Sequence, residues 1–137
     1  MTTTVSQLLQ QAIAAHNRKD FQKAEKLYRA VLKLYPKQPD ANHNLGLLAL
    51  AVNKPALALP FFKTAVSTNY NMEKYWLSYI TALIKDRQLD KAKKLIRQGS
   101  KKAATQTRFH EAYNSLGLGL KAAGNLRDAE IALRKAI

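Results

Sequence analysis

Alanines recur at a nearly fixed interval along this chain, and that interval constrains its fold more than any other feature. The intervals are 34, 34 and 37 residues, between Ala24, Ala58, Ala92 and Ala129. Four residues after each alanine stands a large apolar residue, in order Tyr28, Phe62, Ile96 and Leu133. Self-similarity at such a period indicates a repeat array, in which each unit buries its apolar face against the next.

Each repeat divides into two amphipathic segments separated by helix-breaking residues. The breaks fall at 17–20, 53–55, 86–88 and 124–125, where Asn, Asp, Gly or Pro stand. Pro36 and Pro39 mark a further break between the first two repeats. The pattern predicts seven or eight helices and no strand. Pro60 lies inside one of these helices and is expected to bend it slightly, because proline cannot donate to the preceding turn.

These residues resemble the tetratricopeptide repeat (TPR). The resemblance is carried by Asn44-Leu45-Gly46, Ala58, Trp76, Tyr79, Ala92, Tyr113, Leu116-Gly117 and Ala129. It implies an all-α fold, a right-handed superhelical array of antiparallel helix pairs. We expect one domain, 1–137, with repeats at 5–38, 39–72, 73–109 and 110–137, the last incomplete. The third repeat has three extra residues, which we place in a longer loop at 99–108.

The repeat register also predicts which aromatic side chains form the core. Trp76 and Tyr79 fall on the register and are expected to be buried. Tyr75 falls outside it and is expected to be exposed. An aromatic platform for stacked bases is the alternative for these three residues.

Composition argues against catalysis and against metal binding. The chain has no cysteine, and its three histidines lie in three different repeats without metal-ligand spacing. Its nine acidic residues form no acid–base pair, and no phosphate-binding loop is present. We therefore expect no enzyme activity, no cofactor and no metal. The absence of cysteine favours a reducing, cytoplasmic setting. No stretch is apolar enough for a membrane span, so we expect no membrane insertion.

The resemblance implies a non-catalytic scaffold that binds a peptide or partner protein on the concave face of the superhelix. In that family the first helix of each repeat lines this face. Transferred by register, the predicted contacts are His43, Asn44, Leu47, Lys74, Ser78, Thr81, Asn114 and Ser115. Amides, hydroxyls, apolar groups and an ammonium suit a peptide backbone with intermittent apolar side chains.

Two interpretations of Asn44 remain open. Its amide is able to bond a ligand backbone through both its donor and its acceptor. Alternatively it is an amide on the helix surface or between repeats, with no ligand role.

The strong positive charge suggests a second function. The chain carries 23 Lys and Arg against 9 Asp and Glu, a net charge of +14. Many of these cations lie late in the third repeat. A solvated outer face is the simple explanation, and an anion site at Lys91, Lys94, Arg97 and Lys101 is the functional one. Such a site predicts nucleic-acid or acidic-partner binding as the alternative to a peptide scaffold.

The end of the chain suggests self-association. The fourth repeat is shorter than the first, and no polar capping helix follows it. Its last segment contains Leu126, Ile131, Leu133 and Ile137. We expect some of these to form an uncapped apolar edge that pairs with another copy, and Leu133→Lys to dissociate the pair. The resemblance further suggests the N-terminal TPR region of a larger bacterial protein.

Overall fold

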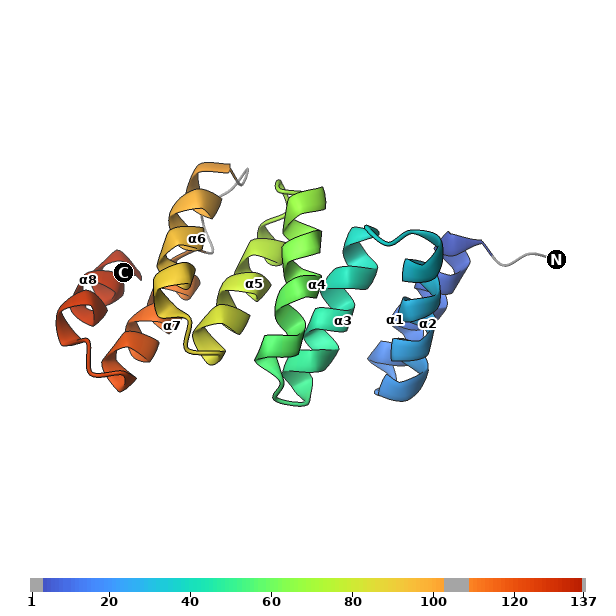
Figure 1. Cartoon of the computed structure of the whole chain (residues 1–137), viewed down its shortest axis with the longest axis horizontal. Coiled ribbons are helices and arrows are strands. Elements are labelled where there is room, and N and C mark those ends of the chain that lie inside the picture. Colours follow the sequence, from blue (N-terminus) through green and yellow to red (C-terminus); the bar gives the residue numbers. More distant parts are fainter. Residues whose placement is uncertain (1–3, 103–108, 137) are drawn as a thin grey trace. The chain divides into compact units, whose positions relative to one another are not determined.

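The structure, a computed structural model, describes residues 4–102 and 109–136, and the side chains of 4–98 and 112–136. It contains eight helices and no strand within these ranges, as the sequence predicts (Figure 1). The helices are α1 (Val5–Asn17), α2 (Phe21–Leu34), α3 (Pro39–Ala51), α4 (Pro55–Thr68), α5 (Glu73–Lys85), α6 (Leu89–Lys102), α7 (Phe109–Ala122) and α8 (Leu126–Ala136). The predicted insertion begins within α6, and residues 103–108 lie outside the described ranges.

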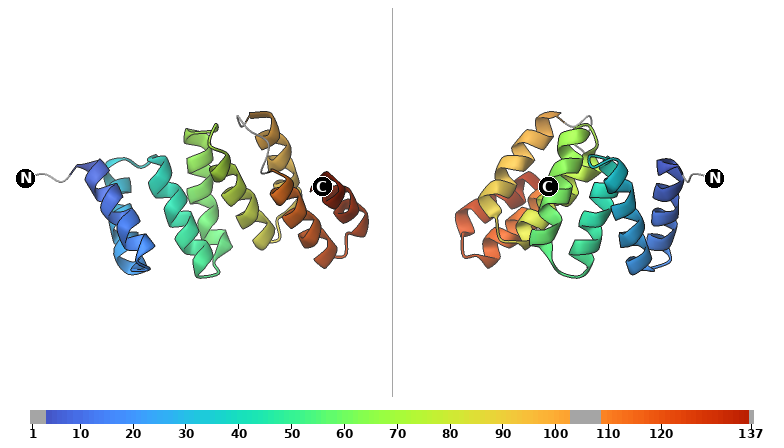
Figure 2. Two further views of the ribbon diagram at one scale, coloured as in Figure 1. Left: turned by 180° about the vertical axis from the view of Figure 1, so that it is seen from behind. Right: turned by 45° about the vertical axis from the view of Figure 1, so that its right-hand side comes forward.

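The helices form two compact units. Unit 1 spans Met1–Thr68 and contains α1 to α4, in which α1 packs on α2, α2 on α3 and α3 on α4. Unit 2 spans Asn69–Ile137 and contains α5 to α8, in which α7 packs on α5, α6 and α8. Consecutive helices within each pair are antiparallel, as the hairpin of α7 and α8 at the C-terminal end shows (Figure 2).

The turn inside each helix pair has the same backbone conformation four times. After α1 the N–H of Lys19 donates to His16 O at 3.0 Å, and that of Asp20 donates to Ala15 O at 2.9 Å. These two bonds define a Schellman motif, which satisfies carbonyls at a helix end and requires a left-handed residue. The left-handed residues, Lys19, Asn53, Arg87 and Gly124, have φ of 65°, 59°, 65° and 83°. Only the last is glycine, so three turns place a side chain where L-residues are disfavoured.

Where the two helices of a pair cross, a glycine on the first helix can face a large residue on the second. A Cβ on Gly46 of α3 would lie 2.6 Å from Phe62 Cδ1 of α4. A Cβ on Gly117 of α7 would lie 2.5 Å from Leu133 Cγ of α8. Both glycines therefore allow a large side chain from the partner helix to pack directly on the backbone. Leu133 accordingly packs on Gly117 within its own repeat and is half-buried, so a more exposed residue of α8 is a cleaner probe for self-association.

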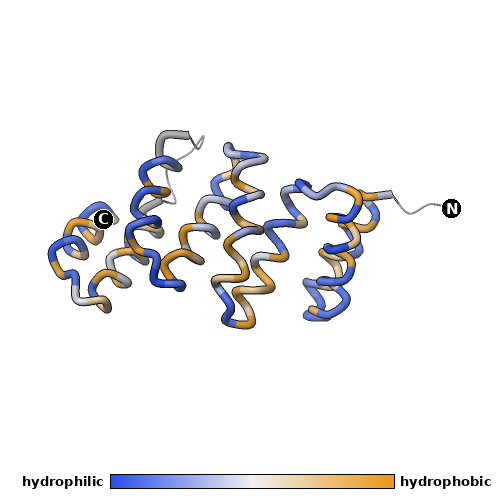
Figure 3. Tube along the Cα trace, viewed as in Figure 1, coloured by the Kyte–Doolittle hydropathy of each residue, from blue (hydrophilic) through white to orange (hydrophobic). Residues whose placement is uncertain are grey.

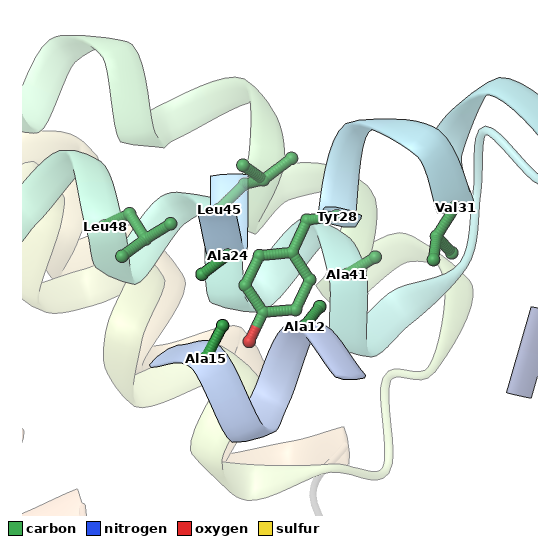
Figure 4. Close-up of a cluster of buried hydrophobic side chains, with 8 residues drawn as sticks. All are labelled: Ala12, Ala15, Ala24, Tyr28, Val31, Ala41, Leu45 and Leu48. Carbon is green, nitrogen blue, oxygen red and sulfur yellow. The ribbon is translucent and has the colours of Figure 1, made fainter. Parts of the chain in front are cut away.

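Unit 1 has a core centred on Tyr28. The Tyr28 ring is fully buried among Ala12, Ala15, Ala24 and Ala41, with Leu45 and Leu48 beside it (Figure 4). Small side chains on the surrounding helices make room for the one large ring, as close helix packing requires. Along the chain, apolar residues are frequent in α3 and α4 and rare in α6 (Figure 3).

Unit 2 buries the aromatic residues at the start of α5. Trp76 and Tyr79 are 3% and 5% exposed, which confirms the predicted core positions. Tyr75 is also buried, at 2% exposed, so the expectation that it faces solvent is wrong. Burial of all three rings leaves no stacking platform for nucleic-acid bases on this helix.

Pro60 lies inside α4, and the helix continues through it. None of the helices in the described part of the chain combines the length and apolar character that crossing a membrane requires.

Candidate binding surfaces

The predicted peptide contacts of unit 1 differ in accessibility. Asn44 and Leu47 are half-buried on α3. His43 is 5% exposed, and its ring centroid lies 5.6 Å from that of Phe62 on α4. His43 therefore packs between α3 and α4, and the expectation that it lines an open face is not met. One residue of difference along a helix rotates a side chain by about 100°, which takes it from the surface to the core.

The Asn44 amide belongs to a polar chain that crosses unit 1. Its side chain hydrogen-bonds the Tyr28 hydroxyl, whose oxygen lies 3.1 Å from His16 Nδ1. Burial raises the pKa of Tyr28 to about 12, and the Asn44 bond acts weakly against that rise. Burial likewise lowers the pKa of His16 below 6.5. Asn44 is thus an amide that joins α3 to α2 of the preceding repeat, and its side chain is half-buried.

The predicted contacts of unit 2 lie on α5 and α7, two helices that pack together. Lys74 is exposed and its Nζ lies 5.5 Å from the Tyr75 ring centroid, while Ser78 and Thr81 are half-buried. On α7, Asn114 and Ser115 are exposed. Ser78 and Ser115 hold the same register position on these two neighbouring helices.

The predicted anion site on α6 divides into two surfaces. Arg97 lies with Lys93 in a groove against α7 and α8. Lys91 and Lys94 are exposed outside that groove. Lys101 belongs to α6, but its side chain lies outside the described part of the chain.

Each unit contains a groove that the sequence did not predict. The unit 1 groove, of about 380 Å³, lies between α2, α3 and α4 and is lined by Phe21, Leu45, Leu48, Val52, Leu57 and Phe61, with Glu25, Arg29 and Lys54 at its rim. The unit 2 groove, of about 190 Å³, lies between α6, α7 and α8, the helices equivalent to α2, α3 and α4 two repeats later. Its lining consists of Lys93, Arg97, Tyr113, Leu116, Leu120, Asp128, Ile131, Ala132 and Lys135.

The signal for these grooves was present in the chain but was not distinctive. Phe21, Leu57 and Ile131 are large apolar residues that repeat packing leaves exposed, at 42%, 60% and 48%. A prediction from the repeat period assigns apolar residues to the core, because the period does not describe the space between one helix pair and the next.

No group of side chains in the described residues resembles a metal site. Every buried polar side-chain atom described in the structure has a hydrogen-bond partner.

Comparison with solved structures identifies the fold. YrrB, described as a TPR protein with an unusual peptide-binding site, superposes with a TM-score of 0.84 over 98% of this chain and 68% of its own, at 19% identity. MamA from Desulfovibrio magneticus RS-1 (residues 41 to end) gives 0.82 over 98% and 75%, at 22% identity. Another MamA structure gives 0.84 over 100% and 73%, at 22% identity. No family model and no curated protein matches the sequence.

Proposed function

From its tetratricopeptide-repeat fold, we propose that this chain is a non-catalytic scaffold that binds an extended peptide along the first helices of its repeats. The fold supports a role in protein–protein interaction. The observation that favours this particular surface is the register position shared by Asn44, Ser78 and Ser115. All three are polar and at least partly exposed, although large apolar residues surround them in sequence.

Amides and hydroxyls at this register position suit the backbone of a peptide. Lys74, Thr81 and Asn114 would add donors, and Leu47 would add an apolar contact. Backbone hydrogen bonds supply affinity in this kind of recognition, while pockets for side chains supply specificity. His43, being buried against Phe62, would not contact the peptide.

The test uses Asn44→Ala with Tyr28→Phe as its control. A peptide selected from a random display library against the purified chain serves as the labelled probe. Asn44→Ala should weaken its binding by about 1–3 kcal/mol, because ligand backbone groups lose their partner. Tyr28→Phe removes the internal Asn44 bond but leaves the amide in place, so it should preserve affinity. Equal losses in both variants would show that Asn44 acts only within the protein.

Nucleic-acid or acidic-partner binding through α6 is the second candidate function. The exposure of Lys91, Lys94 and Arg97 on one helix favours it, together with the net charge of +14. Binding to phosphates weakens steeply with salt, whereas a peptide site of amides and apolar groups responds little. Lys94→Glu with Arg97→Glu should abolish binding of a labelled oligonucleotide and leave the library peptide bound.

A further inference from the structure

We propose that the unit 2 groove is a second docking site, which takes an acidic peptide segment through one large apolar side chain. This groove contains none of the proposed contacts on the first helices. It shares only Arg97 with the basic face of α6. It therefore represents a separate surface with its own ligand chemistry.

The size and floor of the groove suit a single side chain. Its volume is about 190 Å³, below the roughly 300–1,000 Å³ of typical small-molecule pockets. Leu116 and Leu120 of α7, each 2% exposed, form an apolar floor, and Ile131 of α8 forms a wall that is 48% exposed. Covering that wall would bury apolar surface at about 25 cal/mol for each Å² removed from water. A leucine or phenylalanine from a partner segment would provide this cover.

The rim of the groove selects for acidic neighbours of that side chain. Three cations line it, Lys93, Arg97 and Lys135, against the single carboxylate of Asp128. Lys93 Nζ lies 3.1 Å from Asp128 Oδ2, and the Asn125 amide donates to the same oxygen at 3.0 Å. The bond from Lys93 lowers the pKa of Asp128, so this carboxylate is ionised and paired at neutral pH.

Of the three cations in the groove, Arg97 and Lys135 are left without a carboxylate partner in the described part of the chain once Lys93 is paired with Asp128. Neither makes an ion pair within the described residues, and Lys135 Nζ lies 5.7 Å from the Tyr113 ring centroid. Placed on α6 and α8, on opposite sides of the apolar floor, they would flank a bound side chain. Carboxylates on either side of that residue would complement both cations, and such complementarity steers association and fixes register.

The unit 1 groove provides an internal comparison, because it has the same register but different charges. Its arginine, Arg29, is already paired with Glu25 at 3.1 Å. The positions of Asp128 and Lys135 are occupied there by Leu57 and Thr64. The unit 1 groove thus has a wider apolar lining with Lys54 as its one unpaired rim cation among the described residues. Preference for acidic segments should belong to unit 2.

The experiment measures fluorescence anisotropy of a short labelled peptide of glutamates and aspartates around one leucine. Two charge-reversal pairs are compared, Arg97→Glu with Lys135→Glu inside the groove, and Lys91→Glu with Lys94→Glu outside it. Both pairs change the net charge equally. We expect the groove pair to raise the Kd at least tenfold and the outer pair to raise it less than threefold. Replacing the peptide's leucine with serine should weaken binding to the unmodified protein by a similar factor.

Two results would overturn the proposal. Equal losses in the two charge-reversal pairs would show that binding follows net charge alone, and displacement of the peptide by a poly-uridine oligonucleotide would then assign the cations to nucleic acid. Undiminished binding of the serine peptide would show that the apolar floor is not used. Ile131→Ser provides a further check that is neutral in charge, and it should weaken the leucine peptide but not the serine one.

Discussion

The indole N–H of Trp76 donates a 2.7 Å hydrogen bond to the backbone carbonyl of Tyr70, which ties the first turn of α5 to the segment before it. Thirty-four residues earlier, the amide of Asn42 donates at 3.1 Å to the carbonyl of Pro36. The two side chains differ in size and polarity, but they hold the same register position and donate to the equivalent backbone carbonyl of their repeats. The contact that joins one repeat to the next therefore requires a side-chain N–H donor at this position, and it does not require a tryptophan.

Removing that donor should destabilise unit 2. Trp76→Phe keeps an aromatic ring but leaves the Tyr70 carbonyl without its partner, at a cost of about 1–3 kcal/mol. Trp76→Ala adds a cavity and should cost about 3–5 kcal/mol. Urea unfolding followed by circular dichroism measures both. A loss below about 1 kcal/mol for Trp76→Ala would mean that the indole is not packed in the core.

The left-handed turn residues predict stabilising substitutions. Arg87 has φ of 65°, and a left-handed L-residue costs about 1–2 kcal/mol. Glycine removes that strain, but its greater freedom in the unfolded chain lowers the free energy of unfolding by about 0.4–1 kcal/mol. Arg87→Gly should therefore raise the free energy of unfolding by about 0.5–1 kcal/mol. Gly124→Ala, the matched control with φ of 83°, should lower it. Destabilisation by Arg87→Gly would show that the arginine side chain makes a compensating contact.

Acidification should weaken unit 1 through His16. Burial holds the folded-state pKa of His16 below its unfolded value of 6.5, so the unfolded chain binds the proton first. Stability is therefore full above about pH 6.5 and declines as the pH falls below it. Urea titrations at about pH 7.5 and about pH 5.5 should show this decline, and His16→Gln should reduce it. Because other groups also titrate, the difference between the two proteins is the relevant quantity. An identical pH dependence in the variant would contradict the assignment.

Close packing at Gly46 predicts sensitivity to a single methyl group. A Cβ there would lie 2.6 Å from Phe62 Cδ1, and the buried ring has little space in which to move. Gly46→Ala should cost about 1–3 kcal/mol despite alanine's better helix propensity. At Gly119 a new Cβ would lie 3.1 Å from Ile84 Cγ2 and 3.2 Å from Leu89 Cδ2, so these neighbours would have to move by only a few tenths of an ångström. Gly119→Ala should therefore change stability by less than about 1 kcal/mol.

Self-association through the last helix stays a prediction, with a different probe from the one that the sequence suggested. Leu126 at the start of α8 is 66% exposed and lies outside the unit 2 groove. Sedimentation at tens of micromolar should show an oligomer that Leu126→Lys dissociates. Ile131→Ser, which alters the groove, should leave that oligomer intact. A monomer in the unmodified protein would refute this edge as an interface.

Much of the fold could be predicted, because packing between two helices repeats with the period of the chain. The turns, the helix pairs and the buried positions of Trp76 and Tyr79 all follow from that period. The burial of Tyr75 and His43 could not be predicted from the period. Each lies beside the row of core positions on its helix, where a buried side chain widens the core without changing the period. The sequence left an inter-repeat role for Asn44 open but could not identify Tyr28 as its partner, because the two residues lie in different repeats. The grooves lie between pairs, where the shapes of several side chains combine and no single residue marks the site.

The exchange of size between paired positions has a consequence for how this chain can change. Gly46 faces Phe62 and Gly117 faces Leu133, whereas the same two positions hold Ala12 with Tyr28 in the first repeat and Ile80 with Ile96 in the third. The four pairs differ in total volume, so each crossing is fitted to its own two residues and their surroundings. At the two glycine pairs, enlarging the glycine alone would force a clash with the large side chain that faces it, so that side chain must become smaller first. Divergence at these two crossings is therefore expected to proceed by correlated steps, through an underpacked intermediate.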